Sequence, residues 1–261
     1  MSPPGAVDPS VGAALAVVGS ANLDIVVGVP RHPRLGETVI GGDHAEVAGG
    51  KGANQAVAAA RLGAPTSFVG CVGDDAPGQA LRRALADDGV EIAALETVAG
   101  APSGVALIVV GEEGENTIVV SPGANARLSP GHVAAAGARI AEAAALLVQL
   151  EIPLATVEAA VGAARGLVVC NPAPATALPP SVLERVDVLV PNRSELALLA
   201  GADDEPVTTG EVTELARGLP GPAAVGAEVA HLPAMRVAAV DATAAGDAFC
   251  AALTVRLLAG D

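Results

Sequence analysis

Short apolar runs alternate along the chain with amphipathic stretches of helix length that are rich in alanine. The apolar runs predict strands at residues 14–19, 67–72, 146–150, 167–170 and 186–190. The amphipathic stretches predict helices at residues 53–62, 78–86 and 156–164, and residues 140–145 continue the alternation. This rhythm is typical of βαβ units, so it predicts a largely parallel sheet that is covered by helices.

Two segments break this rhythm. They are residues 37–47 and residues 104–121, and in the second of these GVALIVV and NTIVVS flank GEEGE as two strands around a turn. Such a pair is typical of an antiparallel hairpin. No linker divides the chain, so we expect a single domain over residues 1–261 whose β-lid is built from about residues 31–48 and 101–122.

Polar side chains follow three of the predicted strands. Glu151 comes after LLVQL, Asn171 after LVVC and Asn192 after DVLVP. Ligands of open parallel sheets bind beyond the carboxyl ends of the strands. One polar residue at a strand end means little, but three of them indicate a site at this edge of the sheet.

The segment DATAAGDAF, residues 241–249, leads small residues into an apolar helix. Ala244, Ala245 and Gly246 leave the backbone bare at the helix N-terminus, where unpaired N–H groups and the helix dipole favour an anion. Asp247 would repel that anion, but it is well placed to accept a proton from an attacking hydroxyl. The alternative is that Asp247 only stabilises the first turn of the helix.

A second glycine-rich turn is GGKGANQA, residues 49–56. It does not match the phosphate-loop pattern, because Gly52 follows the lysine, and it does not match GxGxxG. It is interpreted as a tight turn that brings Lys51, the only lysine of the chain, and Asn54 against a polyhydroxylated ligand, or as an ordinary helix start. Near the N-terminus, Asn22 and Asp24 offer an amide and a carboxylate for vicinal hydroxyls, or form a plain turn.

The composition narrows the function classes. A net charge of −15 and the absence of Trp and Tyr argue against nucleic acid as a partner. No apolar run reaches the roughly 18 residues of a membrane span, and residues 1–10 carry no Lys or Arg of a signal peptide, which predicts a cytoplasmic protein. Cys71, Cys170 and Cys250 lie in or beside apolar runs and are expected to be buried, reduced thiols.

The motifs together resemble the ribokinase/PfkB family of sugar kinases from about residue 15 to residue 258. In chain order they are SANLD, GGKGANQAVAAARLGA, GENTIVVSPGANA, LVQLEIP, NPAPA, PNRSE and DATAAGDAF. The resemblance implies a three-layer α/β/α sandwich with a small β-sheet lid that often joins a homodimer. It also implies transfer of the γ-phosphoryl group of ATP to the hydroxymethyl oxygen of a furanose such as D-ribose, giving ribose 5-phosphate.

The resemblance also implies roles for particular residues. Asp247 would be the base, and the backbone of residues 244–247 would form the anion hole. The residues that would hold the sugar are Asn22, Asp24, Gly50, Lys51, Asn54 and Glu151.

On the nucleotide side, Asn192 would contact the phosphates of ATP. Glu195 would position hydrated Mg²⁺, although the spacing of Asn192 and Glu195 also fits a plain helix start. The side chain of Asp241 and the carbonyl of Thr243 would match two ligands of an activating K⁺ ion.

The sequence departs from the family pattern in two places. Residues 222–228 read PAAVGAE where the family carries a full strand and a Thr-x-Gly turn that contacts ATP. The sequence ends at Asp261, where relatives continue with helices that cover the adenine. If this is the complete polypeptide, we expect poor stability, weak ATP binding and little turnover.

Two alternatives stay open at this point. One is a kinase of the same family for another substrate, such as fructose, deoxyribose or the nucleoside adenosine. The other is a catalytically silent sugar-binding protein, which the departures on the nucleotide side would favour.

Overall fold

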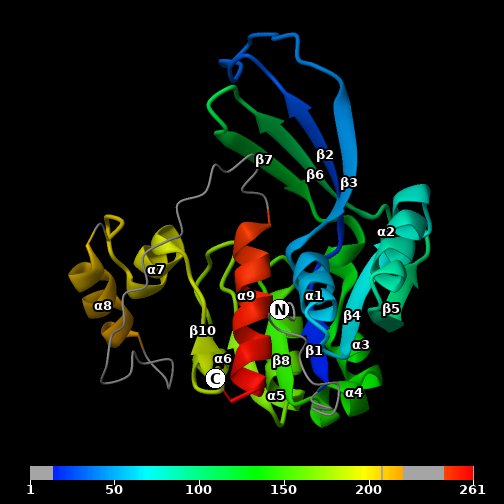
Figure 1. The fold of residues 1–261 in the computed structure, drawn as a ribbon, viewed down its shortest axis with the longest axis vertical. Coiled ribbons are helices and arrows are strands. Elements are labelled where there is room, and N and C mark those ends of the chain that lie inside the picture. Colours follow the sequence, from blue (N-terminus) through cyan, green and yellow to red (C-terminus); the bar gives the residue numbers. More distant parts are fainter. Residues whose placement is uncertain (1–13, 207, 220–243, 261) are drawn as a thin grey trace, which may run out of the picture.

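The computed structural model describes residues 14–206, 208–219 and 244–260. A lid of four strands projects from a body built around a sheet of six strands (Figure 1). The predicted α/β fold with a mostly parallel central sheet and a small β-sheet lid is confirmed. Residues 222–228, where the sequence analysis places a missing strand, lie outside the described residues.

Every neighbouring pair of strands in the central sheet is parallel. In spatial order the strands are β10 (Val188–Leu189), β9 (Leu167–Cys170), β8 (Ala145–Val148), β1 (Leu15–Val18), β4 (Thr66–Gly73) and β5 (Glu91–Val98). The chain adds β4 and β5 on one side of β1, and then returns to add β8, β9 and β10 on the other side. The order therefore reverses between β1 and β8, and such a switch point is where open α/β sheets bind ligands.

Strand β1 is apolar at every position because both of its faces are covered. Leu15 and Val17 belong to one hydrophobic cluster, and Ala16 and Val18 belong to the other. All four side chains are 0% exposed. This is the continuous apolar pattern expected of a central strand in a parallel sheet.

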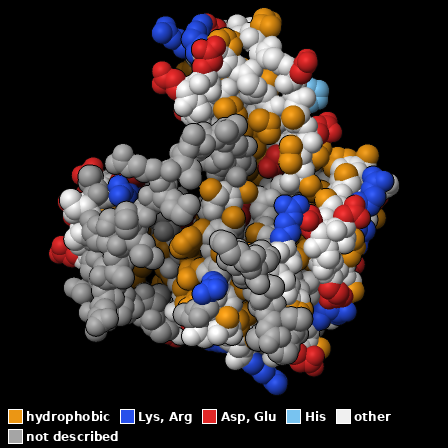
Figure 2. All heavy atoms as spheres, viewed as in Figure 1, with side chains coloured by type: hydrophobic (Ala, Val, Ile, Leu, Met, Phe, Trp, Pro, Cys, Tyr) orange, Lys and Arg blue, Asp and Glu red, His pale blue; other side chains and the backbone are white. Residues whose placement is uncertain are grey.

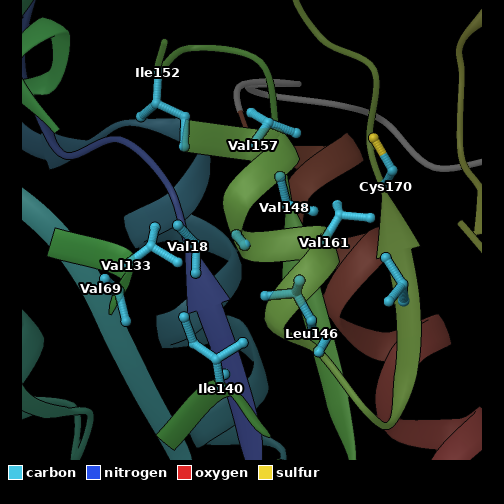
Figure 3. Close-up of a cluster of buried hydrophobic side chains, with 14 of the residues drawn as sticks. Val18, Val69, Val133, Ile140, Leu146, Val148, Ile152, Val157, Val161 and Cys170 are labelled. Atoms are coloured by element: carbon cyan, nitrogen blue, oxygen red, sulfur yellow. The ribbon is translucent and has the colours of Figure 1, made fainter. Parts of the chain in front are cut away.

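Helices cover both faces of the sheet and complete three layers. One face carries α1 (Lys51–Arg61), α2 (Ala76–Asp87) and α9 (Ala245–Leu258). The other carries α3 (Pro130–Ala135), α4 (Gly137–Glu142), α5 (Leu154–Ala163) and α6 (Pro180–Leu183). On this second face, Val18 and Leu146 of the sheet belong to one cluster with Ile140 and Val157 of the helices (Figure 3).

The structure describes three further helical segments. They are the 3₁₀ turn η1 (Gly123–Arg127) and the helices α7 (Arg193–Ala200) and α8 (Thr209–Gly218), of which α7 and α8 pack against each other. In the described part of the chain, no helix is both long enough and apolar enough to cross a bilayer.

The lid is a separate sheet of four strands. Its strands, in spatial order, are β3 (His44–Gly49), β2 (Asn22–Gly28), β6 (Gly104–Val110) and β7 (Asn116–Ser121). The β2–β6 pair is parallel and the other two pairs are antiparallel. Because Asn22 and Asp24 lie in β2, the interpretation of these residues as a plain turn is wrong.

Some elements differ from the predicted ones. The helix predicted at residues 53–62 is Lys51–Arg61, and the strand predicted at residues 186–190 is reduced to Val188–Leu189. Residues 140–145 hold the end of α4 and the start of β8. Strand β5 was not predicted, because its edge position leaves it with Glu91 and Glu96 among its apolar residues.

Candidate active site

A cleft of about 610 Å³ lies between the lid and the carboxyl ends of the central strands. The lid rises above the body, and hydrophobic side chains gather on its lower part in this view (Figure 2). The predicted site residues that line the cleft are Asn22, Asp24, Gly50, Lys51, Asn54, Glu151, Asn171, Asn192, Glu195, Ala244, Gly246 and Asp247. Ala245 begins α9 but does not line the cleft, and Asp241 and Thr243 lie outside the described residues.

Asp247 lies in the first turn of α9 and is buried. The amide of Asn54 donates to its Oδ2 over 3.1 Å, and the amide of Gln55 donates to its Oδ1 over 3.0 Å. Both donors come from α1, which packs beside α9. A carboxylate held by two donors at the edge of a cleft has the geometry of a general base.

The start of α9 has the features of an anion site. Ala244 has φ 61° and ψ 6°, a left-handed conformation that is uncommon for a residue with a Cβ. No described side chain caps this helix, and the N–H groups of a first turn have no partner within the helix. A strained residue at a helix start that no described side chain caps is therefore consistent with backbone donors that bind an anion.

The glycines of GGKG are explained by close packing around β2. A Cβ at Gly49 would lie 2.1 Å from Oδ2 of Asp24, and a Cβ at Gly52 would lie 2.7 Å from the backbone nitrogen of Ser20. Gly50 has φ 91° and also packs against the backbone of Asn22. The motif therefore brings the start of α1 against the base of the lid.

Asp24 is a buried carboxylate on the cleft side of β2. Burial raises its pKa from 3.8 to about 6, and the nearby carboxylates of Glu151 and Asp247 contribute to the rise in the same direction. Among the described residues, none donates a hydrogen bond to this carboxylate. An unpaired acceptor in a cleft is well suited to a ligand that brings its own hydroxyl donors.

Glu151 follows β8 at the switch point of the sheet. Ser20, after β1, donates its hydroxyl to Oε2 over 2.5 Å, and the backbone N–H of Lys51 donates to the same oxygen over 3.2 Å. These two donors leave Oε1 for a ligand. The carboxylate is thereby fixed by residues from both sides of the point where the strand order reverses.

Asn192 and Glu195 form a capping box at the start of α7. The N–H and the amide of Asn192 donate to the two oxygens of Glu195, over 2.7 Å and 2.8 Å. Burial raises the pKa of Glu195, while the hydrogen bond from Asn192 and the charge of Lys51 oppose that rise. The pair therefore stabilises the start of α7. Its role in binding stays a prediction.

Two buried residues at the site were not singled out from the sequence. The amide of Asn125 donates to Oδ1 of Asn22 over 2.7 Å, which turns the Asn22 amide nitrogen away from that contact. Gln55 holds Asp247, as described above. Both lie within quoted motifs, GANA and GANQ, but their partners are more than 100 residues away in the chain.

The three cysteines are buried and free, as predicted. Cys250 lines the cleft beside Asp247, and burial raises the pKa of its thiol to about 12, with the charge of Asp247 adding to the rise. A thiol of this kind is inert. Within the described ranges, no group of three or more His, Cys, Asp or Glu residues is arranged to hold a metal ion.

The arrangement combines groups that suit two different ligands. Carboxylates and amides from the lid and from β8 suit the hydroxyls of a sugar. The start of α9, which no described side chain caps, suits a phosphate. Asp247 lies between these groups, where it can take a proton from a hydroxyl that attacks the phosphate.

Comparison with known proteins gives one consistent family. Residues 13–261 match the model of the pfkB family carbohydrate kinases. A ribokinase of Haemophilus influenzae is 38% identical over 266 residues, which cover 94% of this chain and 85% of the relative.

Two solved structures have the same fold. A ribokinase of Thermotoga maritima has a TM-score of 0.82 and 33% identity, over 95% of this chain and 87% of that one. A ribokinase of Arabidopsis thaliana, solved with ribose and ATP, has a TM-score of 0.81 and 31% identity, over 96% of this chain and 87% of that one.

Proposed function

We propose that this chain transfers the γ-phosphoryl group of ATP to the 5-hydroxyl of D-ribose, because it belongs to the pfkB family of carbohydrate kinases. The products are ADP and ribose 5-phosphate. Ribokinases similar over most of this chain support ribose as the acceptor, and the Arabidopsis thaliana structure contains both ribose and ATP.

One observation in this chain carries the proposal. Asp247 is held by two amide donors at the N-terminus of α9, where no described side chain caps the helix, and it lines the cleft beneath the lid. A base fixed beside an anion site is what phosphoryl transfer to an alcohol requires, because that chemistry depends on positioning and on electrostatic stabilisation.

The reaction can be assigned to these residues step by step. Asn22, Asp24, Gly50, Lys51, Asn54 and Glu151 hold the sugar. Asp247 accepts the proton of the 5-hydroxyl as its oxygen forms a bond to the γ-phosphorus, and the bond from that phosphorus to the oxygen bridging to the β-phosphate breaks. The N–H groups of residues 244–247 stabilise the charge on the transferring group.

Mg²⁺ and K⁺ are proposed as cofactors. Bound Mg²⁺ would neutralise charge on the β- and γ-phosphates of ATP. Glu195 fits a water-mediated role, since both of its oxygens already accept hydrogen bonds from Asn192, which contacts the phosphates in this proposal. Asp241 and Thr243 remain the predicted K⁺ ligands.

A homodimer formed through the lid is also proposed. The face of the lid turned away from the cleft carries the cross-strand partners Leu107 and Val119, whose side chains are 50% and 61% exposed. Leu23 and Ile25 of β2 lie on the same face. An apolar sheet face of this kind is typical of a protein contact, and a mass measurement by light scattering tests it. A cytoplasmic location stays a prediction.

The proposed function is tested by ribose-dependent consumption of ATP in the presence of Mg²⁺ and K⁺. We expect Asp247→Asn to lower kcat by about 100-fold or more, because loss of a general base costs about 10²- to 10⁴-fold. Asp87→Asn makes the same chemical change at an exposed position in α2 and should leave kcat unchanged.

The assay should be repeated with deoxyribose, fructose and adenosine. A higher kcat/KM with one of these compounds would reassign the acceptor within the family. Ribose binding without turnover would favour the catalytically silent sugar-binding protein. An Asp247→Asn variant that keeps most of its turnover would overturn the assigned base.

A further inference from the structure

Gln55 is a polar residue on the buried face of α1, where its neighbours in the helix are small. Gly52, Ala53, Ala56 and Ala59 are the other buried residues of this helix. Gln55 is 0% exposed and does not line the cleft. Close packing of α1 against α9 needs only small or apolar residues, so an amide at this position calls for a reason other than packing.

Gln55 belongs to a chain of buried amides that reaches Asp247. Gln149, directly after β8, donates to Oε1 of Gln55 over 2.5 Å. The Nε2 of Gln55 donates both to Oδ1 of Asp247 over 3.0 Å and to Oδ1 of Asn171 over 3.2 Å. Asn171 donates in turn to the carbonyl of Val190 over 3.0 Å.

The direction of each hydrogen bond between these buried amides follows from one fixed acceptor. The carbonyl of Val190 can only accept, so the amide nitrogen of Asn171 must face it and Oδ1 of Asn171 must face Gln55. A flipped Gln55 would then turn its oxygen toward two other acceptors, one of them a carboxylate. The Nε2 of Gln55 is therefore committed to Asp247, and Gln149 is oriented by Gln55.

The hydrogen bond from Gln55 restricts a soft torsion. The terminal torsion of an aspartate is broad and roughly two-fold, so the backbone alone does not fix the plane of its carboxylate. Asn54 holds Oδ2 from the cleft side and Gln55 holds Oδ1 from the buried side. Without Gln55, the carboxylate is tied at one oxygen and can turn about that contact.

We propose that Gln55 is a positioning residue for phosphoryl transfer, which acts by holding the Asp247 carboxylate in the orientation that accepts the proton of the sugar hydroxyl. The inference rests on the proposed function of Asp247. The second hydrogen bond of Gln55, to Asn171 and through it to Val190, links the base to the segment that leads to Asn192. Gln55 thus connects the acceptor side of the cleft with the predicted nucleotide side.

The test compares Gln55→Met with Gln149→Met. Each variant replaces a fully buried amide by an apolar side chain of similar length. Gln55→Met removes three hydrogen bonds of this group of amides, and Gln149→Met removes one of the three. Of these two glutamines, only Gln55 contacts Asp247, and neither lines the cleft. The measurements are kcat and KM for ribose at saturating ATP, together with the thermal midpoint of each variant.

We expect Gln55→Met to lower kcat by about 10- to 100-fold, the size of effect that a small misplacement of a reacting group produces. The KM for ribose should stay within about threefold, because Asn54 and the other sugar ligands remain. Gln149→Met should keep kcat within about threefold, and its thermal midpoint should fall less than that of Gln55→Met, because it leaves only the oxygen of Gln55 without its donor. This division between kcat and KM separates positioning from a purely structural role.

The wild type is measured first with ribose, so that a failure of the proposed function can be distinguished from a failure of the proposed role of Gln55. If the wild type does not phosphorylate ribose, the proposed function and this inference both fall. If it does, the inference alone is overturned when Gln55→Met keeps wild-type kcat, or when Gln149→Met loses as much kcat as Gln55→Met. Should Gln55→Met not fold, Gln55→Asn keeps the amide one methylene short of Asp247, and the same loss of kcat is expected.

Discussion

Replacement of Asp24 by asparagine should stabilise the protein while it weakens sugar binding. The structure places this carboxylate in a buried position, near Glu151 and Asp247, with no donor from a described residue. Its pKa rises from 3.8 to about 6. That rise corresponds to at most about 3 kcal/mol of unfavourable free energy for the charged form, which solvent in the open cleft reduces to about 1 to 2 kcal/mol.

The sign of the pH dependence follows from the two pKa values. Between about pH 4 and pH 6 the folded protein keeps a proton that the unfolded chain has released, so the free energy of unfolding falls as the pH rises through this window. The amide that Asp24→Asn introduces does not titrate. The advantage of this variant should therefore be full at pH 8 and about half as large at pH 5.

The assay is urea unfolding of the wild type and Asp24→Asn at several values between pH 5 and pH 8, which stay above the isoelectric point of about 4.5. Asp43→Asn changes an exposed carboxylate near the lid and should alter the free energy of unfolding by less than about 0.5 kcal/mol. Ribose affinity of Asp24→Asn should fall by about 10-fold or more, as expected when a charged acceptor is lost. A variant that is no more stable than the wild type at pH 8, or whose advantage is the same at pH 5, would refute the reasoning.

Two further predictions concern the packing at the base of the lid. Gly19→Ala should destabilise the protein by about 2 to 3 kcal/mol in urea unfolding, because the added Cβ would lie 2.8 Å from the backbone of Gly52. A Cβ at Gly28 would meet nothing within 4 Å, so the control Gly28→Ala should change the free energy of unfolding little. Asn125→Ala should cost about 2 to 3 kcal/mol and raise the KM for ribose about tenfold, because Asn22 loses the donor that orients it. An unchanged KM in Asn125→Ala would show that Asn22 keeps its orientation without this contact.

The body of the fold could be predicted because its elements have local causes. Continuous apolar runs such as LAVV predict central strands of a parallel sheet, and β1 is buried on both faces. The alanine-rich helices follow from their spacing, and the start of α7 follows from Asn192 and Glu195, which form a capping box. Each of these features depends on residues that are close in sequence.

The lid and the edge of the sheet were harder to predict. In β2 the polar residues Asn22 and Asp24 alternate with Leu23 and Ile25, because one face of the strand lines the cleft. In the sequence, these polar residues suggest a turn. Among the described strands, β5 pairs only with β4, and this edge position tolerates charged residues that hide its strand character. In both cases the pattern reflects neighbours that are distant in the chain.

The site could be predicted in its motifs but not in its contacts. The cleft brings together Asp247, Glu151 and the sugar-side residues that the motifs indicated. The support from Gln55 to Asp247 spans 192 residues, and the support from Asn125 to Asn22 spans 103 residues. No local pattern records such a pairing, because it exists only when α1 meets α9 and when η1 meets the base of the lid.

The proposed reaction is tested by identifying the product formed from ATP and D-ribose by ³¹P nuclear magnetic resonance. We expect the wild type to form equal amounts of ADP and ribose 5-phosphate, and Asp247→Asn to form both about 100-fold or more slowly. A phosphate on another hydroxyl of the sugar, or hydrolysis of ATP without a phosphorylated sugar, would contradict the central claim that Asp247 activates the 5-hydroxyl for phosphoryl transfer.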